Sequence, residues 1–240
     1  MKRFIFFASV FSLLVIILSF WVVIRYRSVP ETPRDIVTIP EGWTVSEINL
    51  YLKGEGVLAD EELSGDLEGY LFPDTYEFFL DSTAAVVQQK FQDNFSAKLE
   101  EIGVDVLRSD LQNIIIVASL IEKEVQNVQD KRMVSGILWK RLQNEMPLQV
   151  DATICYIKDT ELCLPITASD KEIDSEYNTY LYRGLPPGPI CNPGADSILA
   201  AIQPEESPYW YYLSSGGGGR TIFARTLDEH RQNIIKYLNE

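Results

Sequence analysis

The chain has 240 residues, enough for one large domain or for one medium domain with a small satellite. It carries 35 Asp and Glu against 21 Lys and Arg, a formal net charge of −14. A polyanion would be repelled by this charge, so nucleic-acid binding is not expected. The single histidine, His230, excludes zinc sites built on two or three histidines. Any Ser-His-Asp or Cys-His catalyst would have to use His230, which we expect to be structural.

An uncharged segment near the N-terminus predicts a membrane anchor. Phe4 to Ile24 carries no charge, and as a helix it would span roughly 30 Å, the thickness of a bilayer's hydrocarbon core. A cleaved signal peptide is the alternative, but its apolar stretch is usually only about 7–15 residues long and is followed by an A-x-A site, which is missing here. Lys2 and Arg3 favour an inside N-terminus. We therefore expect residues 1–27 to form a cytoplasmic stub and a single-pass anchor in the cell membrane, with the large domain extracytoplasmic.

Residues 28–66 are predicted to form a tether and a small strand–helix module. Ser28 to Asp35 contains two prolines and no periodicity, whereas Val37 to Ile39 is typical of a strand. Thr44-Val-Ser-Glu47 is a capping box that opens a short helix, and Gly54 ends it. Because such a piece is too small to hold a core alone, it must lean on something else or act as a minimal satellite.

Residues 67–240 are predicted to form a mixed α+β domain. Helices are expected, in chain order, from a cap at Ser82 or Thr83 to Gly103, over Leu111–Glu124, over Asp130–Asn144, from Asn192-Pro193 through Ile202, and from Thr226 to near Leu238. The expected fold class is therefore α+β, with a single N-terminal transmembrane helix ahead of the module and this domain.

A β-hairpin and a long irregular segment are also expected. Tyr209–Leu213 and Thr221–Ala224 are predicted strands that flank a flexible tip at Gly216–Gly219. From Pro147 to Gly194 helical signals are few and turn residues are many, which is typical of a binding surface.

Glu122 is the most informative candidate for chemistry. It closes the helix opened by the capping box Ser109-Asp-Leu-Gln112, after a run that is apolar on every side, so we expect its carboxyl group to be desolvated, protonated and suited to general acid catalysis. The alternative is that Glu122, Lys123 and Glu124 simply mark where the helix emerges into solvent, as charge runs at helix ends usually do. Glu124 is expected on the opposite helix face, where it could not pair with Glu122 across one substrate.

The irregular segment supplies polar and aromatic groups suited to sugar. Tyrosines stack on pyranose faces, while amides and hydroxyls bond sugar hydroxyls; each residue taken alone is more often a turn or core residue. The candidates for substrate binding are Gln149, Asp151, Thr153, Tyr156, Tyr177, Asn178, Thr179 and Tyr180.

Six ordered blocks resemble one known family, the endolytic murein transglycosylases of YceG-like type. They cover the chain from Leu67 to the C-terminus. The blocks are Leu67-Glu-Gly-Tyr-Leu-Phe-Pro-Asp-Thr-Tyr-Glu-Phe78, Ala118-Ser-Leu-Ile-Glu-Lys-Glu124, Met146-Pro-Leu-Gln-Val-Asp-Ala-Thr153, Tyr177-Asn-Thr-Tyr180, Gly184-Leu-Pro-Pro-Gly-Pro-Ile190 with Asn192-Pro-Gly194, and Thr226-Leu-Asp-Glu-His230.

The resemblance implies a membrane-anchored lyase that cuts nascent peptidoglycan strands internally. Such enzymes cleave the bond between N-acetylmuramic acid (MurNAc) and N-acetylglucosamine (GlcNAc) without water, leave a 1,6-anhydro-MurNAc end, and work beside the cell-wall elongation machinery. Glu122 stands at the family's catalytic acid/base, and the chemistry needs no cofactor and no metal. Residues 67–240 would be the YceG-like catalytic domain.

The chain departs from the family pattern at several places. Thr38-Ile-Pro-Glu-Gly-Trp-Thr44 resembles the start of a LysM-like module, but the connection after it is cut to Val57–Asp66, so the module over 28–66 is truncated. Arg220 stands where the family's hairpin often has histidine, and Val150 where a smaller or polar residue is usual.

Two other functions remain open on the sequence. An ordinary glycoside hydrolase needs two carboxyl groups flanking the scissile bond, and Asp74 or Asp151 could supply the second. The other is a non-catalytic, membrane-anchored peptidoglycan-binding protein in which Glu122 is incidental.

The three cysteines suit an oxidising compartment. Cys155 and Cys163 are close enough in sequence to staple a hairpin, and we predict that they form a disulfide, which leaves Cys191 unpaired.

Overall fold

The structure, a computed structural model, describes residues 33–159, 166–214 and 220–237. The predicted anchor at Phe4 to Ile24 lies outside these residues, and no helix within them is long and apolar enough to cross a membrane. Asp35–Glu240 forms one compact unit.

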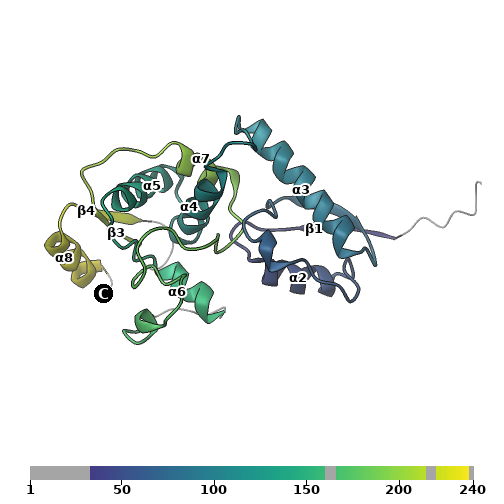
Figure 1. Cartoon of the computed structure of the whole chain (residues 1–240), viewed down its shortest axis with the longest axis horizontal. Helices are drawn as coiled ribbons and strands as arrows, with labels where there is room; N and C mark the ends of the chain where they lie inside the picture. Colours follow the sequence, from purple (N-terminus) through teal and green to yellow (C-terminus); the bar gives the residue numbers. More distant parts are fainter. Residues whose placement is uncertain (1–32, 160–165, 215–219, 238–240) are drawn as a thin grey trace, which may run out of the picture. The chain divides into compact units, whose positions relative to one another are not determined.

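The described residues fold as helices with two small sheets, so the mixed α+β class is confirmed. In chain order the elements are β1 (Arg34–Thr38), α2 (Val45–Gly54), β2 (Thr75–Phe79), α3 (Ala84–Glu101), α4 (Leu111–Glu124), α5 (Val128–Gln143), α6 (Asp151–Lys158), α7 (Ala195–Ile202), β3 (Tyr211–Ser214), β4 (Thr221–Ala224) and α8 (Leu227–Tyr237), with 3-10 turns at Gly65–Leu67 and Asp170–Glu172 (Figure 1).

A first hydrophobic core joins α2, α3 and the β1–β2 sheet. The predicted capping box is confirmed, because the Thr44 hydroxyl accepts from the backbone of Glu47 and the Glu47 carboxylate accepts from the backbone of Thr44. The backbone N–H of Ile39 donates to Asp74 O at 2.9 Å, so the strand–helix module pairs with the region that follows it in the chain. The core draws on both sides of position 66: Val37, Ile39, Ile48, Leu52, Val57 and Leu58 pack with Leu71, Tyr76, Phe78, Val87 and Phe91. The strand–helix module is thus part of a larger core and not a satellite.

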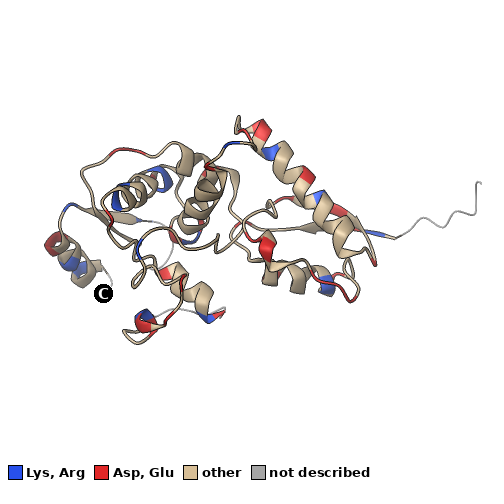
Figure 2. Ribbon diagram, viewed as in Figure 1, with Lys and Arg blue, Asp and Glu red and all other residues tan. Residues whose placement is uncertain are grey.

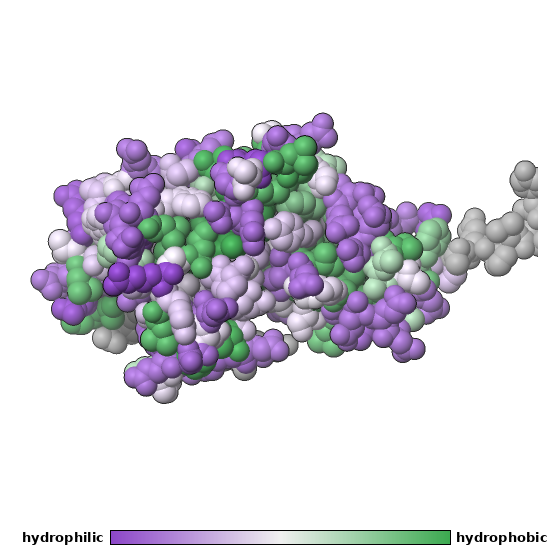
Figure 3. All heavy atoms as spheres, in the orientation of Figure 1, coloured by the Kyte–Doolittle hydropathy of each residue, from purple (hydrophilic) through white to green (hydrophobic). Residues whose placement is uncertain are grey.

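The long helix α3 closes this core with one apolar stripe. Its N-cap is Thr83, and Val87, Phe91, Phe95 and Leu99 are buried at four-residue spacing, as predicted. Acidic and basic residues alternate along its other side (Figure 2). Hydrophobic residues reach the face drawn in Figure 3 in separate areas divided by hydrophilic ones.

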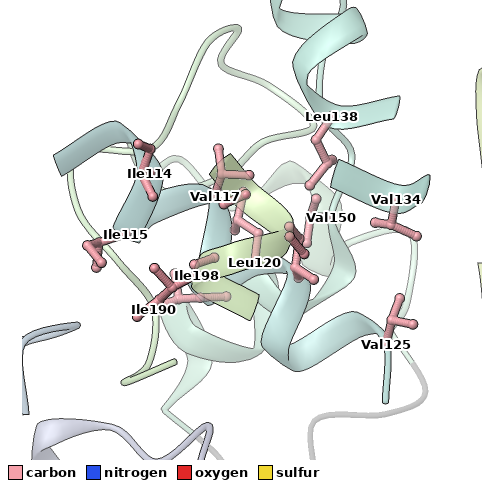
Figure 4. Packing of buried hydrophobic residues seen from close by; sticks show 14 of the residues in the cluster. Ile114, Ile115, Val117, Leu120, Val125, Val134, Leu138, Val150, Ile190 and Ile198 are labelled. Carbon is pink, nitrogen blue, oxygen red and sulfur yellow. The ribbon is translucent and has the colours of Figure 1, made fainter. Parts of the chain in front are cut away.

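A second core surrounds α4. All eight residues from Ile114 to Ile121 are buried, and α4 packs against α7 and α5, as predicted for a central helix (Figure 4). The bounds of α4 match the prediction, but the capping box at Ser109 is wrong: the N-cap is Asp110, and no side chain accepts a capping hydrogen bond.

The segment predicted to be irregular contains a helix, α6. Its sequence is rich in β-branched and aromatic residues and its N-cap is Val150, which offers no side-chain cap, so the usual start signals are missing. Cys155 lies in this helix and not in a hairpin, and it is disulfide-bonded. Cys191 is a free, buried thiol, whereas Cys163 lies outside the described residues, so its pairing stays a prediction.

Asn192 does not cap α7, which begins after Gly194. Its side chain is fully buried, and its side-chain oxygen Oδ1 accepts from Leu71 N at 2.8 Å. Its amide donates to Trp43 O at 2.9 Å and to Glu68 Oε1 at 3.2 Å. A side chain that satisfies three distant groups at once joins the two cores, which explains why it is not available as a cap.

The C-terminal hairpin is confirmed. β3 and β4 pair antiparallel with Tyr211 opposite Ala224, while the predicted tip at Gly216–Gly219 lies outside the described residues. In α8 the ring of His230 stacks on Tyr211, with ring centroids 5.4 Å apart, which agrees with a structural role.

Gly136 is expected to tolerate no side chain. A Cβ there would overlap the backbone oxygen of Glu205, and Glu205 N donates to Arg132 O at 2.9 Å, so the two backbones cannot separate freely. Gly136→Ala should lower the free energy of unfolding by about 1–3 kcal/mol in urea denaturation, the usual cost of overpacking. Gly54→Ala is the matched control, because its Cβ would meet open space at the end of α2. Equal effects of the two substitutions would contradict the expectation.

Candidate active site

Glu122 lies in the last turn of α4 and is held by three hydrogen-bond donors. Its Oε1 accepts from Lys131 Nζ at 3.1 Å, and its Oε2 accepts from Gly194 N at 3.0 Å and from Ser197 Oγ at 2.7 Å. The side chains of Glu122 and Lys131 are only 8% and 5% exposed. Gly194 is the N-cap of α7, so the carboxylate also lies at a helix N-terminus, which favours an anion.

Lys131 gives the Glu122 side chain a buried, positively charged partner. The expectation of a desolvated group is met, and a buried ammonium offsets the cost of a charge in such a site. The protonation of Glu122 at neutral pH stays a prediction.

The sequence reading did not identify Lys131, Gly194 or Ser197. A usable signal existed for Lys131, because it lies on the same face of α5 as the buried Val134 and Leu138, where a lone charge demands a partner. Gly194 and Ser197 carried no such signal.

Glu122 is one of the residues that line a cavity of about 220 Å³ at the end of α4. The cavity is lined by Glu122, Lys123, Glu124, Val125, Gln126, Asn127, Asp130, Ser214, Arg220 and Thr221. Glu122 and Glu124 thus line the same cavity, although they were expected on opposite faces of the helix; whether they could pair across one substrate stays a prediction. The chain becomes extended at Val125, with φ −142° and ψ 132°, so the cavity wraps the end of the helix instead of following one face.

Glu124, which lines the same cavity, is a carboxyl group with a raised pKa. Burial raises the pKa of Glu124 to about 7, and the negative charge of Asp151 adds to the effect. Its Oε1 accepts weakly from Ala152 N at 3.4 Å, and Ser214 Oγ donates to its backbone oxygen at 2.8 Å. A carboxyl group with this pKa can exchange a proton near neutral pH.

The raised pKa of Glu124 predicts a pH-dependent stability. Between its ordinary value of 4.5 and about 7 the folded state binds the proton that the unfolded state has lost, so the free energy of unfolding falls as pH rises. Glu124→Gln should remove on the order of 2 kcal/mol of this fall, measured by urea denaturation at several pH values. Burial also raises the pKa of Glu68 to about 7, so the part of the pH-dependent fall that Glu68 causes should remain in this variant. Glu55→Gln, an exposed control, should leave the profile unchanged; an unchanged profile for Glu124→Gln would contradict the assignment.

Two of the predicted substrate-binding residues, Asp151 and Tyr180, lie beside Glu124. The Tyr180 hydroxyl donates to Asp151 Oδ1, and Lys171 Nζ lies 3.8 Å from Asp151 Oδ1 and 4.4 Å from the centroid of the Tyr180 ring. This cluster extends the polar surface from the cavity towards α6.

Three other candidates for substrate binding are buried and form hydrogen bonds within the protein: Thr153, Asn178 and Thr179. Thr153 and Thr179 share a hydroxyl contact at 3.1 Å, and Thr179 Oγ1 accepts from Val150 N at 2.9 Å. The amide of Asn178 donates to Ile173 O at 2.8 Å. The side chain of Gln149 is exposed on a backbone with φ +53°. Roles of these residues in binding sugar stay predictions.

Tyr177 faces a different cavity, of about 530 Å³, between α2 and α6. It lies against Tyr156 with ring centroids 5.0 Å apart, and Glu68 lines the same cavity. Of the predicted substrate-binding residues, Tyr156 and Tyr177 therefore line this second cavity, and none lines the cavity at Glu122.

Asp74, the other carboxyl considered for a hydrolase, lies beside β2. It accepts from Asn94 Nδ2 at 3.2 Å and pairs with Lys98 at 3.6 Å, and it lines neither cavity. Within the described ranges no three His, Cys, Asp or Glu residues are grouped to hold a metal ion.

Known proteins similar to this chain share one activity in their names. An endolytic murein transglycosylase of Bacillus subtilis is 34% identical over 192 residues, which covers 75% of this chain and 50% of that protein. One from Streptococcus pneumoniae is 30% identical over 187 residues, covering 72% of this chain and 32% of that protein. The chain therefore spans half or less of the length of these curated relatives.

A solved structure and a family of proteins are also similar to this chain. A crystal structure of a YceG-like protein from Listeria monocytogenes aligns with a TM-score of 0.68 and 30% identity, over 82% of this chain and 75% of that one. The YceG-like family matches residues 22–236, which include both cores and every residue around Glu122. The resemblance carried by the sequence blocks is confirmed, and the chain belongs to the YceG-like family.

Proposed function

We propose that this protein is an endolytic murein transglycosylase, a lyase that cleaves MurNAc–GlcNAc bonds within peptidoglycan strands. The observation that carries the proposal is Glu122, a residue that lines a cavity and whose nearly buried carboxyl group accepts hydrogen bonds from Lys131, Gly194 and Ser197. The names of the similar proteins from Bacillus subtilis and Streptococcus pneumoniae support it.

In this mechanism Glu122 acts first as an acid and then as a base. The protonated carboxyl donates its hydrogen to the glycosidic oxygen as the bond to C1 breaks, which leaves an oxocarbenium-like MurNAc. The carboxylate then removes the hydrogen of the C6 hydroxyl, whose oxygen closes onto C1 to form the 1,6-anhydro ring. The proton count balances without water, and Lys131 stabilises the carboxylate between the two steps.

The test is product analysis by mass spectrometry after incubation with uncrosslinked glycan strands. Anhydro ends support the lyase, reducing ends support a hydrolase, and pelleting with sacculi without cleavage supports a non-catalytic binding protein. Reducing ends or binding alone would overturn the proposal.

One observation favours the hydrolase as second candidate. Glu124 lines the same cavity as Glu122, and its pKa of about 7 suits the acid of a two-carboxylate pair. Asp151, which lies next to Glu124, belongs to this alternative, whereas Asp74 lies elsewhere.

The cellular setting is part of the proposal. The length and flanking charges of Phe4 to Ile24 support a single-pass anchor in the cell membrane with the catalytic domain extracytoplasmic. Residues 28–66 would be a tether and a truncated LysM-like module, and cell-wall synthesis machinery would be the neighbouring partner. Digestion of the domain by protease added to intact spheroplasts is expected; protection would contradict this orientation.

A further inference from the structure

Hydrogen bonds hold the loop between β1 and α2 to two segments near Glu122: the end of α4 and the segment before α7. Gly42 N donates to Asn192 O at 2.9 Å, and Asn192 N donates to Trp43 O at 2.8 Å. From the other side Lys123 Nζ donates to Gly42 O at 3.0 Å. These three hydrogen bonds hold the loop between the last turn of α4 and the segment that enters α7.

Glu41, which precedes Gly42, extends directly over Gly194. A Cβ at Gly194 would overlap the Glu41 carboxyl group and lie 2.8 Å from its Cγ. Gly194 is the residue whose backbone N–H donates to Glu122, so the Glu41 carboxyl group lies in the immediate surroundings of Glu122. Glu41 is exposed, and among the described residues no donor is bonded to its carboxyl group.

The electrostatics agree with this placement. Partial desolvation raises the pKa of Glu41, and the negative charge of Glu122 raises it further. Lys131 opposes the shift and Asp196 adds to it. The charged groups around Glu41 are therefore Glu122, Lys131, Lys123 on α4 and Asp196 on α7.

We propose that Glu41 is a positioning residue of the active site, whose carboxylate competes with Glu122 for Lys131 and thereby extends the pH range over which Glu122 keeps its catalytic proton. The inference rests on the proposed function for its role in catalysis, but the coupling between the two carboxyl groups is independent of it. A negative charge beside Glu122 disfavours ionisation of Glu122, so removing that charge makes Glu122 lose its proton at lower pH.

The experiment compares kcat/KM against pH for four variants. Glu41→Gln removes the charge at constant shape, and Glu41→Asp keeps it on a shorter side chain. Gly194→Ala leaves the backbone N–H in place but displaces the flexible end of Glu41. Glu55→Gln is the control, an exposed acid at the end of α2.

For Glu41→Gln the alkaline limb of the profile should move about one unit to lower pH, which lowers kcat/KM ~10-fold on that side. The acid-side plateau should stay. Glu41→Asp should restore part of the limb, Gly194→Ala should copy Glu41→Gln, and adding Gly194→Ala to Glu41→Gln should move the limb no further. A wild-type profile for Glu41→Gln, or a uniform loss at every pH, would overturn the inference.

A titration that needs no activity separates this inference from the proposed function. In protein labelled with ¹³C at glutamate carboxyl carbons, the Glu122 resonance is assigned by its loss in Glu122→Gln. Its midpoint should move to lower pH in Glu41→Gln, whatever products the enzyme forms. An unmoved midpoint would refute the coupling even if wild-type protein releases anhydro ends.

Discussion

Replacing Glu122 by Gln is expected to lower the rate of glycan cleavage ~10²–10⁴-fold. Gln keeps the shape of the side chain and can still accept from Gly194 N and Ser197 Oγ, but it has no transferable proton. The rate of formation of anhydro ends from uncrosslinked strands, followed by mass spectrometry, measures the effect. Glu55→Gln should keep the wild-type rate.

Stability must be measured with this variant, because Gln leaves the Lys131 ammonium buried without its counter-charge. The assay is run at a temperature where circular dichroism shows the variant folded. If folded Glu122→Gln cleaves at the wild-type rate, Glu122 is not the acid, and Glu124 and Asp151 become the candidates.

Replacing Lys131 by Met is expected to lower the free energy of unfolding by about 3–5 kcal/mol, the usual cost of leaving one buried charge unpaired. The Glu122 carboxylate would keep only Gly194 N and Ser197 Oγ as partners in a site that is 8% exposed. Urea denaturation measures the loss. Cleavage should fall as well, because the carboxylate that forms between the two steps loses its stabilising charge.

The double variant Glu122→Gln with Lys131→Met tests whether the unpaired charge of Glu122 causes this loss of stability. Without the carboxylate the loss of the ammonium costs much less, so the double variant should be more stable than Lys131→Met alone. Lys53→Met is the control, since Lys53 forms an exposed pair with Glu62 and contributes far less. Additive losses at Glu122 and Lys131 would show that the two groups are not energetically paired.

Local sequence signals predicted the elements that carry the site. The apolar run from Ile114 to Ile121 placed α4 and its last-turn Glu122, since a helix apolar on every side must be central. The capping box at Thr44 and the stripe from Val87 to Leu99 worked for the same reason: caps and periodicity act within one or two turns. Where such signals were absent, as at Val150, the helix that follows was missed.

The chemistry around Glu122 was decided only by tertiary structure. Lys131, Ser197 and Glu41 come from three different segments, and they meet because α4 packs between α5 and α7 while the β1–α2 loop is bonded to Asn192. Sequence alone determined that one carboxyl group would be nearly buried at the end of a central helix. Which charges offset that burial depends on long-range packing of side chains, and this is why the partners of Glu122, unlike its position, could not be predicted from its neighbours in the chain.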